Sequence, residues 1–366
     1  MIAKSKPWNR MARQLHEEPE SRIFHWLKRF GGCFHSFLLQ ITMKPLGDEP
    51  TYKGKPLSDW ARMTQDENLD SQPSAQALEA MEAVRAIGAS AIPFLLKWLE
   101  PPWPDSVLPG GAVQSLKALG PQANSAIPEL AKLLDKYKPP HSMDDYSAWH
   151  DACEALSYLG PDALPVLLAA AKNIQGQHIQ WELIQNFGNF GSNGIPAIPA
   201  LIGWCHDKDA WVRLGAVNAL GQIGQQPEVV IPVLLAALED PDPLVKRDAS
   251  EALGGFGKGA KAALPDLIKA LDDPDWQTQT GAIGGLGRIG EQRENVLPLL
   301  VRKLHDENRI VRRCAAFALG NLGGKGAFDA LMRATEDPDG FVREAVFQSL
   351  KGIDAQALAK SGKKFF

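Results

Sequence analysis

Apolar and small residues recur in the second half of the chain with the spacing of one face of an α-helix. Between Val212 and Ile223 they stand at positions i, i+4, i+7, i+8 and i+11, and the same spacing returns between Val245 and Phe256, 33 residues later. This pattern predicts an amphipathic helix in each stretch. A glycine follows each such helix, where the backbone often needs a positive φ angle. The glycines in this position are Gly88, Gly120, Gly160, Gly191, Gly224, Gly257, Gly290 and Gly323.

A second apolar stretch follows each glycine and starts near a proline. Proline is tolerated in the first turn of a helix because the N–H that it lacks would have no partner there. The prolines in this position are Pro93, Pro128, Pro165, Pro199, Pro232, Pro265 and Pro298, with Asp329 in the last unit. Each unit therefore predicts two helices, called below the first and the second helix. Asp-Pro-Asp turns at 240–242, 273–275 and 337–339 close three units, and we expect their aspartates to cap the next first helix.

A unit of two short helices cannot bury its apolar face alone. Consecutive units must therefore stack and share one continuous core, which is the arrangement of an α-solenoid. The period persists from Gly88 to Gly323, and its last four steps are each 33 residues long. Such regularity over most of the chain indicates a repeat protein rather than several unrelated domains.

The repeated residues resemble those of HEAT-repeat proteins, in the short-repeat form named after the bilin (phycobilisome) lyases. The resemblance rests on the Ala-Leu-Gly ends of first helices, the Ile-Pro starts of second helices, the Asp-Pro-Asp turns and three Val-Arg pairs. These pairs are Val212-Arg213, Val311-Arg312 and Val342-Arg343. The resemblance covers about residues 74–354, and it implies that second helices line the concave surface. The predicted fold is all-α, a right-handed α-solenoid (superhelix) of about eight to nine two-helix HEAT-like repeats. Because these repeats serve scaffolds, lyases and hydroxylases alike, the resemblance indicates a fold and not one function.

Four segments are expected along the chain: a basic and apolar N-terminal leader at 1–50, an N-terminal capping segment at 51–73, the HEAT-like solenoid at 74–354 and a C-terminal tail at 355–366. Terminal repeats need such a cap over their open face. The links at 101–110 and 136–147 are irregular. Insertions of this kind emerge on one side of a solenoid and often bind a partner, and the alternative is that they are merely tolerated.

The leader leaves several roles open. Residues 1–30 carry seven basic and three acidic side chains, and a mostly apolar stretch follows at 30–43. This order is compatible with an export or lipidation signal, with a segment on a membrane surface, or with a disordered cytosolic leader or a start at Met43. His35 and Gln40 interrupt the apolar stretch and no Ala-x-Ala cleavage site follows. A cytoplasmic location is therefore favoured, and membrane contact through residues 1–43 is the alternative.

Charge and cysteine content exclude several classes of protein. Lysine and arginine total 39 against 43 aspartates and glutamates, a net charge of −4, so binding of nucleic acid through overall charge is not expected. No run of about 18 apolar residues predicts a membrane-spanning helix. The four cysteines are scattered over the 366 residues, which is too few for a disulfide scaffold.

Two arrangements look chemically active but fit the repeat better. Gly285 to Gly290 reads Gly-x-Gly-x-x-Gly, which binds dinucleotides only when a strand precedes it and a helix starts at it. Here a predicted helix ends at Gly290. His150 and Cys153 lie one helical turn apart and Cys205-His206 ends another helix, but nothing in the sequence brings the two pairs together as metal ligands. We therefore predict no catalytic residue, no cofactor and no metal site.

The first helix that ends at Gly290 is unusually rich in glycine. Gly281, Gly284, Gly285 and Gly287 all fall inside it, and each costs up to about 1 kcal/mol relative to alanine. Thr278-Gln279 also replaces the Val-Arg pair there. We expect this unit to have the lowest local stability in the regular half of the chain, and therefore the fastest amide hydrogen exchange.

A partner site is predicted on the second helices, at the position four residues after each proline. Basic residues occupy both ends of this column and small residues occupy its middle, beside Trp204. The column consists of Lys97, Lys132, Ala169, Gly203, Ala236, Lys269, Arg302 and Arg333. A partner backbone or helix could approach the small residues closely, with acidic side chains meeting the basic ends. Four tryptophans nearby, at 149, 181, 204 and 211, either form a binding patch or fill gaps between irregular repeats.

The function predicted from the sequence is a non-catalytic protein–protein interaction scaffold or adaptor that holds another protein on the concave face. One alternative is a bilin lyase, or a lyase-like chaperone subunit, with a tetrapyrrole pocket near His150, His178 and Trp204. A second alternative is a structural module of a membrane-anchored complex, supported only by the leader. The sequence leaves the partner's identity and the oligomeric state open.

Overall fold

The structure is a computed structural model, and it describes residues 49–64, 74–103, 109–138, 142–173 and 177–363. The described residues form a stack of two-helix units, as predicted. The first helices are α4 (Ala75–Ile87), α6 (Pro109–Leu119), α8 (Met143–Tyr158), α10 (Gln177–Gln185), α12 (Ala210–Ile223), α14 (Pro243–Gly255), α16 (Trp276–Ile289), α18 (Arg309–Leu322) and α20 (Gly340–Lys360). The second helices are α5 (Ile92–Trp98), α7 (Ile127–Lys136), α9 (Leu164–Asn173), α11 (Ile198–Trp204), α13 (Pro227–Ala237), α15 (Leu264–Ala270), α17 (Arg293–Lys303) and α19 (Gly324–Arg333).

Local sequence signals decide where these helices start and end. All eight glycines of the repeat have positive φ angles, between 50° and 86°, which confirms their role after the first helices. The aspartate side chains of Asp242, Asp275 and Asp339 accept hydrogen bonds from backbone N–H groups in the first turns of α14, α16 and α20, which confirms the predicted caps. Short 3₁₀ segments join several first and second helices: η1 (Gly88–Ala91), η2 (Gly120–Ala126), η3 (Pro161–Ala163), η4 (Asn186–Ala197) and η5 (Gly257–Ala263).

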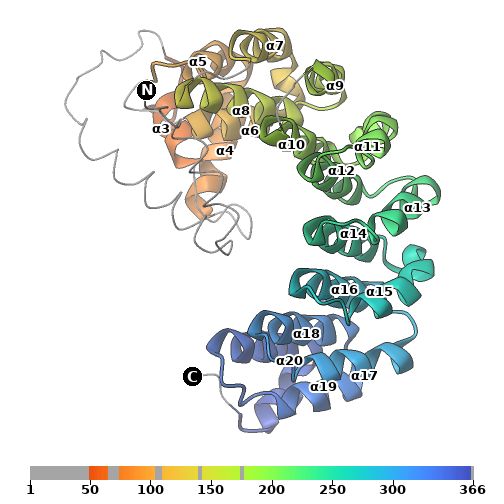
Figure 1. The fold of residues 1–366 in the computed structure, drawn as a ribbon. Helices are drawn as coiled ribbons and strands as arrows, with labels where there is room; N and C mark the ends of the chain where they lie inside the picture. Colours follow the sequence, from red (N-terminus) through yellow and green to blue (C-terminus); the bar gives the residue numbers. More distant parts are fainter. Residues whose placement is uncertain (1–48, 65–73, 104–108, 139–141, 174–176, 364–366) are drawn as a thin grey trace, which may run out of the picture.

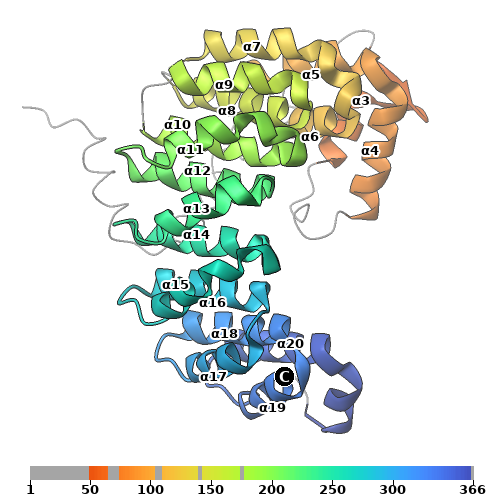
Figure 2. The same cartoon turned by 90° about the vertical axis from the view of Figure 1, so that its right-hand side faces the viewer.

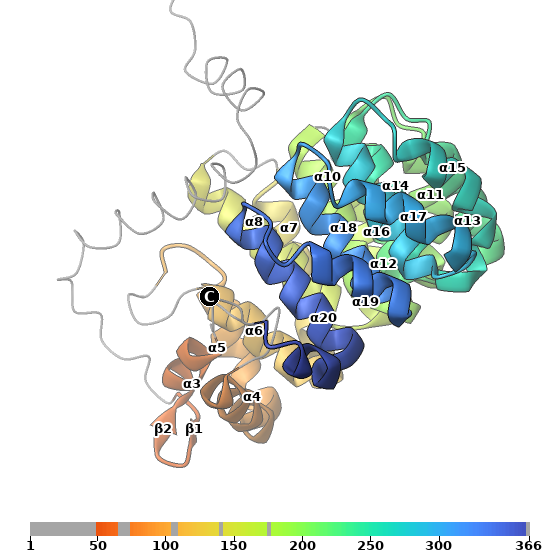
Figure 3. The ribbon, with the colours of Figure 1, turned by 90° about the horizontal axis from the view of Figure 1, so that it is seen from below.

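The stack bends into an arc, with α4 near one end and α20 at the other (Figure 1). First helices form the inside of the arc and second helices its outside, and we call them the inner row and the outer row. Figure 2 shows the arc open on one side, with α4 above and α20 below. In Figure 3, seen from below, α13 and α15 form the edge farthest from α3 and α4.

The expectation that second helices line the concave side is therefore wrong. The physical reason is the spacing within each row. First helices of consecutive units pack directly on each other, most extensively α14 on α16, whereas consecutive second helices touch at few points. At Gly281 and Gly285 of α16, an added Cβ atom would lie 2.6 Å from the carbonyl oxygens of Arg247 and Ser250 in α14. The row with the shorter spacing must lie on the inside of the bend.

A ladder of ion pairs joins consecutive inter-unit turns. Arg213 donates to both carboxylate oxygens of Asp240, at 2.6 and 2.8 Å, and Arg312 does the same to Asp337, at 2.8 and 3.0 Å. The first pair is largely shielded from water, since its side chains are only 12% and 8% exposed. The Val-Arg and Asp-Pro-Asp motifs are therefore two halves of one contact between neighbouring units.

The ladder continues through the unit where the motif is lost. Gln279 stands in the arginine position, and its amide donates to the carbonyl oxygen of Asp273 at 2.7 Å. Lys303, on α17 and only 6% exposed, donates to Gln279 Oε1 at 2.9 Å and to Asp306 Oδ2 at 3.3 Å. A lysine from the outer row thus takes over the link that the missing arginine would have made.

Both ends of the described stack are closed. A hairpin of β1 (Thr51–Tyr52) and β2 (Lys55–Pro56) leads into α3 (Leu57–Met63), which packs on α4 and α6. The indole of Trp60 is buried there and donates to the carbonyl oxygen of Tyr52 at 3.2 Å. At the other end, Asp354 interrupts α20 with a non-helical backbone, and residues 355–360, expected as tail, continue as helix with Leu358 against the core.

The predicted leader falls almost wholly outside the described residues. Among those that are described, no helix has both the length and the apolar character needed to cross a membrane.

Candidate functional site

The predicted partner column is solvent-exposed but lies on the outer row. Every residue of the column is exposed, and Trp204 beside it is half-buried, with its ring centroid 5.9 Å from that of Phe187. Three of the basic members already have acidic partners, in the pairs Lys132–Glu129, Lys269–Glu239 and Arg302–Asp272. A pocket of about 390 Å³ lies between α5 and α7 and includes Lys97 and Lys132. The site itself stays a prediction, now on the convex side.

Exposed apolar side chains gather on the other row. Trp211 on α12, Ile310 and Phe317 on α18, and Phe341 on α20 are between 37% and 61% exposed. Ile310, Arg313 and Phe317 follow one another at i, i+3 and i+7, and therefore share one face of α18. The guanidinium of Arg313 lies 5.7 Å from the ring centroid of Phe317, and Arg313 has no ion pair among the described residues. We call Trp211, Ile310, Arg313, Phe317 and Phe341 the inner stripe.

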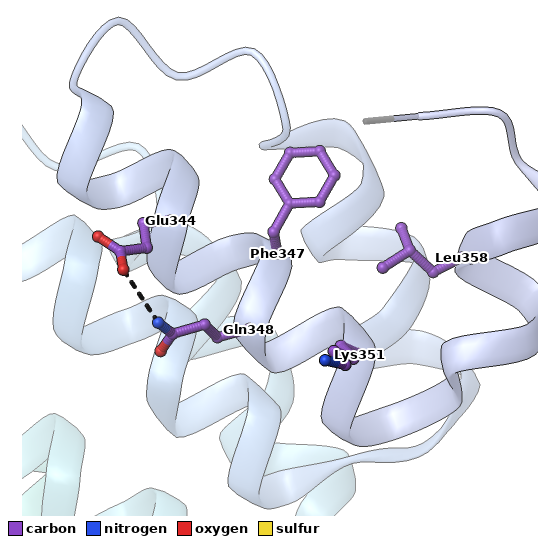
Figure 4. A pocket seen from close by; sticks show the side chains of 5 residues that line it. All are labelled: Glu344, Phe347, Gln348, Lys351 and Leu358. Atoms are coloured by element: carbon purple, nitrogen blue, oxygen red, sulfur yellow. Dashed lines mark hydrogen bonds between the residues drawn. The ribbon is translucent and has the colours of Figure 1, made fainter. Parts of the chain in front are cut away.

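A pocket lies beside the inner stripe at the end of the arc. It has a volume of about 270 Å³ and is lined by Glu344, Phe347, Gln348, Lys351 and Leu358. Figure 4 shows Phe347 and Leu358 on either side of it, on the two segments of α20 that Asp354 separates, and the amide of Gln348 donating to Glu344 at 3.1 Å. The inner row thus combines exposed aromatic rings with an apolar recess. Sequence reasoning missed this surface because it assigned the concave side to the second helices.

A second group of residues on the inner row consists of ionisable side chains that lie close together. His150, Asp151 and Glu154 of α8, with Glu182 of α10 and Tyr146 of α8, form what we call the His150 cluster. His150 Nδ1 lies 3.4 Å from Asp151 Oδ1, and His150 Nε2 lies 3.3 Å from Glu182 Oε1. The hydroxyl of Tyr146 donates to Glu182, and the Tyr146 and His150 rings stack with centroids 6.2 Å apart.

The surroundings of the His150 cluster shift its protonation equilibria. The hydrogen bond with Asp151, together with the nearby Glu182 and Glu154 carboxylates, raises the pKa of His150 against the opposing effect of burial. Burial raises the pKa of Glu154, and the charge of Asp151 adds to it. Complete burial raises the pKa of the Cys153 thiol well above its usual value, so Cys153 is protonated at neutral pH and is not a nucleophile there.

The other residues singled out by chemistry do not join this cluster. Among the described residues, only His150, Asp151 and Glu154 bring three metal-binding side chains within 4.8 Å of one another. His206 donates through Nδ1 to the carbonyl oxygen of Ile202, at 2.9 Å, and burial raises the pKa of Cys205 to about 12. His178 falls in α10, but its side chain lies outside the described residues. Trp204, on α11, belongs to the outer row, whereas His150 belongs to the inner row.

The four tryptophans do not form one patch, although two of them are in contact. Trp181 and Trp211 meet edge to face between α10 and α12, with ring centroids 5.3 Å apart. Trp149 is completely buried in the core, and Trp204 packs on Phe187. These contacts favour gap filling for Trp149 and leave Trp211 as the exposed member.

The repeat model and the Kap121p structures agree with this architecture. A model of HEAT repeats matches residues 164–254, 231–302 and 264–351. Among solved structures, Kap121p is similar over 82% of this chain and 39% of its own, with 15% identity and a TM-score of 0.52. Kap121p bound to the SUMO protease Ulp1p gives 81% and 37% coverage, 15% identity and a TM-score of 0.53. The CpcE–CpcF complex of phycocyanin lyase from Nostoc sp. PCC7120 gives 63% and 92% coverage, 21% identity and a TM-score of 0.43.

The reach of these similarities is limited to the fold. This chain spans about two fifths of the length of Kap121p, and no curated protein matches it. The overlapping matches to the repeat model cover the regular part of the arc, from α9 to α20.

Proposed function

The chain belongs to the HEAT-repeat family, and from this premise we propose that it is a protein-interaction scaffold that holds its partner on the inner row of the arc. The observation that carries the proposal is the distribution of exposed apolar side chains. Of the seven large apolar residues that are exposed in the described part of the chain, Leu78, Met143, Trp211, Ile310, Phe317 and Phe341 lie on first helices, and Val229 alone lies on a second helix. Exposed apolar groups on neighbouring helices, such as Phe317 on α18 and Phe341 on α20, mark an interaction surface.

The inner stripe also indicates the kind of partner. Aromatic residues and arginine are the side chains most often found at binding hot spots. Phe317 and Ile310 offer apolar contact, and the pocket beside Phe347 offers a recess for an apolar side chain. Because Arg313 lacks an acidic partner among the described residues, it is available to a carboxylate of the bound protein. The partner that fits is an amphipathic segment with apolar anchors and an acidic flank.

The outer row fits this role less well. Three of the basic residues in its column are already paired, and Val229 is the one large apolar residue exposed on a second helix in the described part of the chain. The lyase alternative gains no support, because Trp204 and His150 belong to opposite rows. The membrane-module alternative rests on residues 1–43, which lie outside the described residues.

Site-specific crosslinking tests the proposal. A photo-reactive residue at position 317, on the inner row, is compared with one at position 236, on the outer row, in cells that express the chain naturally. We expect one protein to be captured from 317 and not from 236. Its affinity for the purified full-length chain is then measured with Phe317→Glu and with the matched control Val229→Glu, an exposed apolar residue on α13.

We expect Phe317→Glu to weaken binding at least tenfold, since hot-spot residues contribute about 2 kcal/mol or more, and Val229→Glu to leave it unchanged. Circular dichroism confirms that both variants are folded. Capture from position 236 alone, or equal weakening by both variants, would show that the partner uses the outer row.

A further inference from the structure

We propose that His150, Asp151 and Glu154 bind a divalent transition-metal ion on the inner row, with zinc as the best match. One ligand atom from each of these residues lies within 4.8 Å of the other two. The site is independent of the inner stripe and of the protein partner proposed above. It combines one imidazole nitrogen with two carboxylates, a donor set that zinc accepts.

The spacing of the donor atoms suits a small ion. In tetrahedral zinc sites the bonds to nitrogen and oxygen are about 2.0 to 2.1 Å long, so two ligand atoms on one ion lie about 3.3 Å apart. His150 Nδ1 and Asp151 Oδ1 are 3.4 Å apart. These two groups can therefore share an ion without moving the backbone of α8. Glu154 stands one helical turn after His150 on the same helix, and its carboxylate, within 4.8 Å of the other two ligand atoms, would complete the set by a movement of its side chain toward the ion.

The second nitrogen of His150 is oriented as it is in known metal sites. Its Nε2 faces Glu182 Oε1 on α10, at 3.3 Å, and Glu182 in turn accepts a hydrogen bond from the hydroxyl of Tyr146. Histidine ligands almost always donate their other N–H to a carboxylate or carbonyl group, which fixes the tautomer and the ring orientation. Glu182 and Tyr146 would play this supporting role without touching the ion.

The charge of the cluster favours a cation. Asp151, Glu154 and Glu182 bring three carboxylates into a largely buried position, and none of them has a lysine or arginine ion pair in the described part of the chain. The charge of Lys117 acts on Glu154, but its ammonium sits over the Tyr158 ring, at 4.2 Å from the ring centroid. Grouping acidic side chains away from water is costly unless positive charge compensates them, and a protonated His150 brings one positive charge to three carboxylates.

The identity and openness of the site follow from the ligands. Imidazole favours zinc and other late transition metals, whereas calcium and magnesium favour sites made of oxygen alone. Three protein ligands leave a coordination position for water or for a group of a bound molecule, as in sites that are not purely structural. The His150 side chain is 34% exposed, so the ion would be reachable from solvent.

Equilibrium dialysis of the full-length chain against zinc tests the proposal. His16, His25, Cys33, His35, Cys205 and His206 could also bind zinc, so the measurement relies on differences between variants. We expect one equivalent of zinc to be lost in His150→Gln and in Glu154→Gln, with affinity lowered at least 100-fold. Glu182→Gln should weaken that same equivalent 10- to 100-fold, as supporting residues do. The control His206→Gln should bind as the wild type does.

Thermal unfolding of each variant without zinc shows whether it is folded. Zinc should raise the unfolding temperature of the wild type and of His206→Gln more than that of folded His150→Gln. Equal zinc stoichiometry in the wild type and in folded His150→Gln would overturn the site. Preference for calcium over zinc at the wild-type site would overturn the role of the imidazole.

Discussion

Two neighbouring glycines of α16 should respond in opposite directions to the same substitution. Gly→Ala inside a helix gains about 0.8 to 1.0 kcal/mol of helix propensity. At Gly284 the added methyl group would meet only the end of the Arg288 side chain, at 3.6 Å, which can move away. We therefore expect Gly284→Ala to stabilise the protein by about 0.5 to 1 kcal/mol.

At Gly285 the same methyl group would lie 2.6 Å from the carbonyl oxygen of Ser250 and 3.3 Å from Leu267. Because the nearest atom belongs to the backbone of α14, the two helices must move apart. Overpacking of this kind costs about 1 to 3 kcal/mol, which outweighs the gain in propensity. We expect Gly285→Ala to be destabilising by about 1 to 2 kcal/mol.

Urea unfolding followed by circular dichroism measures both variants, and amide hydrogen exchange in α14 and α16 locates the effect. Exchange is needed because stacked repeats can unfold in parts, so that one global free energy is not always defined. Gly255→Ala serves as a further control, since no atom lies within 4 Å of its added Cβ. If Gly285→Ala stabilised the protein as much as Gly284→Ala, the first helices would not be in backbone contact and the argument for the inner row would fail.

Two further predictions concern the ladder between turns. Asp240→Asn removes the charge that faces the shielded Arg213 and should lower the free energy of unfolding by about 1 to 3 kcal/mol. The control Asp272→Asn, in an exposed pair with Arg302, should change it by less than about 0.5 kcal/mol. Equal shifts of the urea midpoint in the two variants would contradict the role assigned to burial. The pKa of Asp273 is lowered, because hydrogen bonds from the Asp275 N–H and from Lys246 outweigh the raising effect of burial. Its contribution is therefore complete above the unfolded carboxyl pKa of about 4 and is lost as the pH falls through the folded value, so urea midpoints between pH 3 and 6 should depend less on pH in Asp273→Asn than in the wild type.

Features that depend on neighbours in the sequence could be predicted. The positive φ angles of the repeat glycines and the caps from Asp242 and Asp275 are decided within a few residues. From helix propensity we also predicted low local stability in the unit that contains α16. This stays a prediction, which amide hydrogen exchange can test. The structure adds that Gly281 and Gly285 are contact points between helices, a role that propensity does not describe.

Features that depend on neighbouring units could not be predicted in the same way. The concave side follows from the relative spacing of two rows of helices, and no single unit contains that information. Lys303 compensates for Gln279 from a different helix, 24 residues away. The contact between His150 and Glu182 spans 32 residues, close to one repeat. A comparison of ionisable residues one period apart was the signal that could have found it.

The backbone contact within the inner row also limits how the arc can deform. Where α14, α16 and α18 already touch through glycine and alanine, the inner side cannot be shortened, so the curvature cannot tighten there. Consecutive helices of the outer row touch at few points, so this row can take up changes in spacing. The distance between consecutive helices of the inner row, its pitch, therefore has a fixed minimum. A ligand that spans several units must match that pitch, or open the arc to a larger radius.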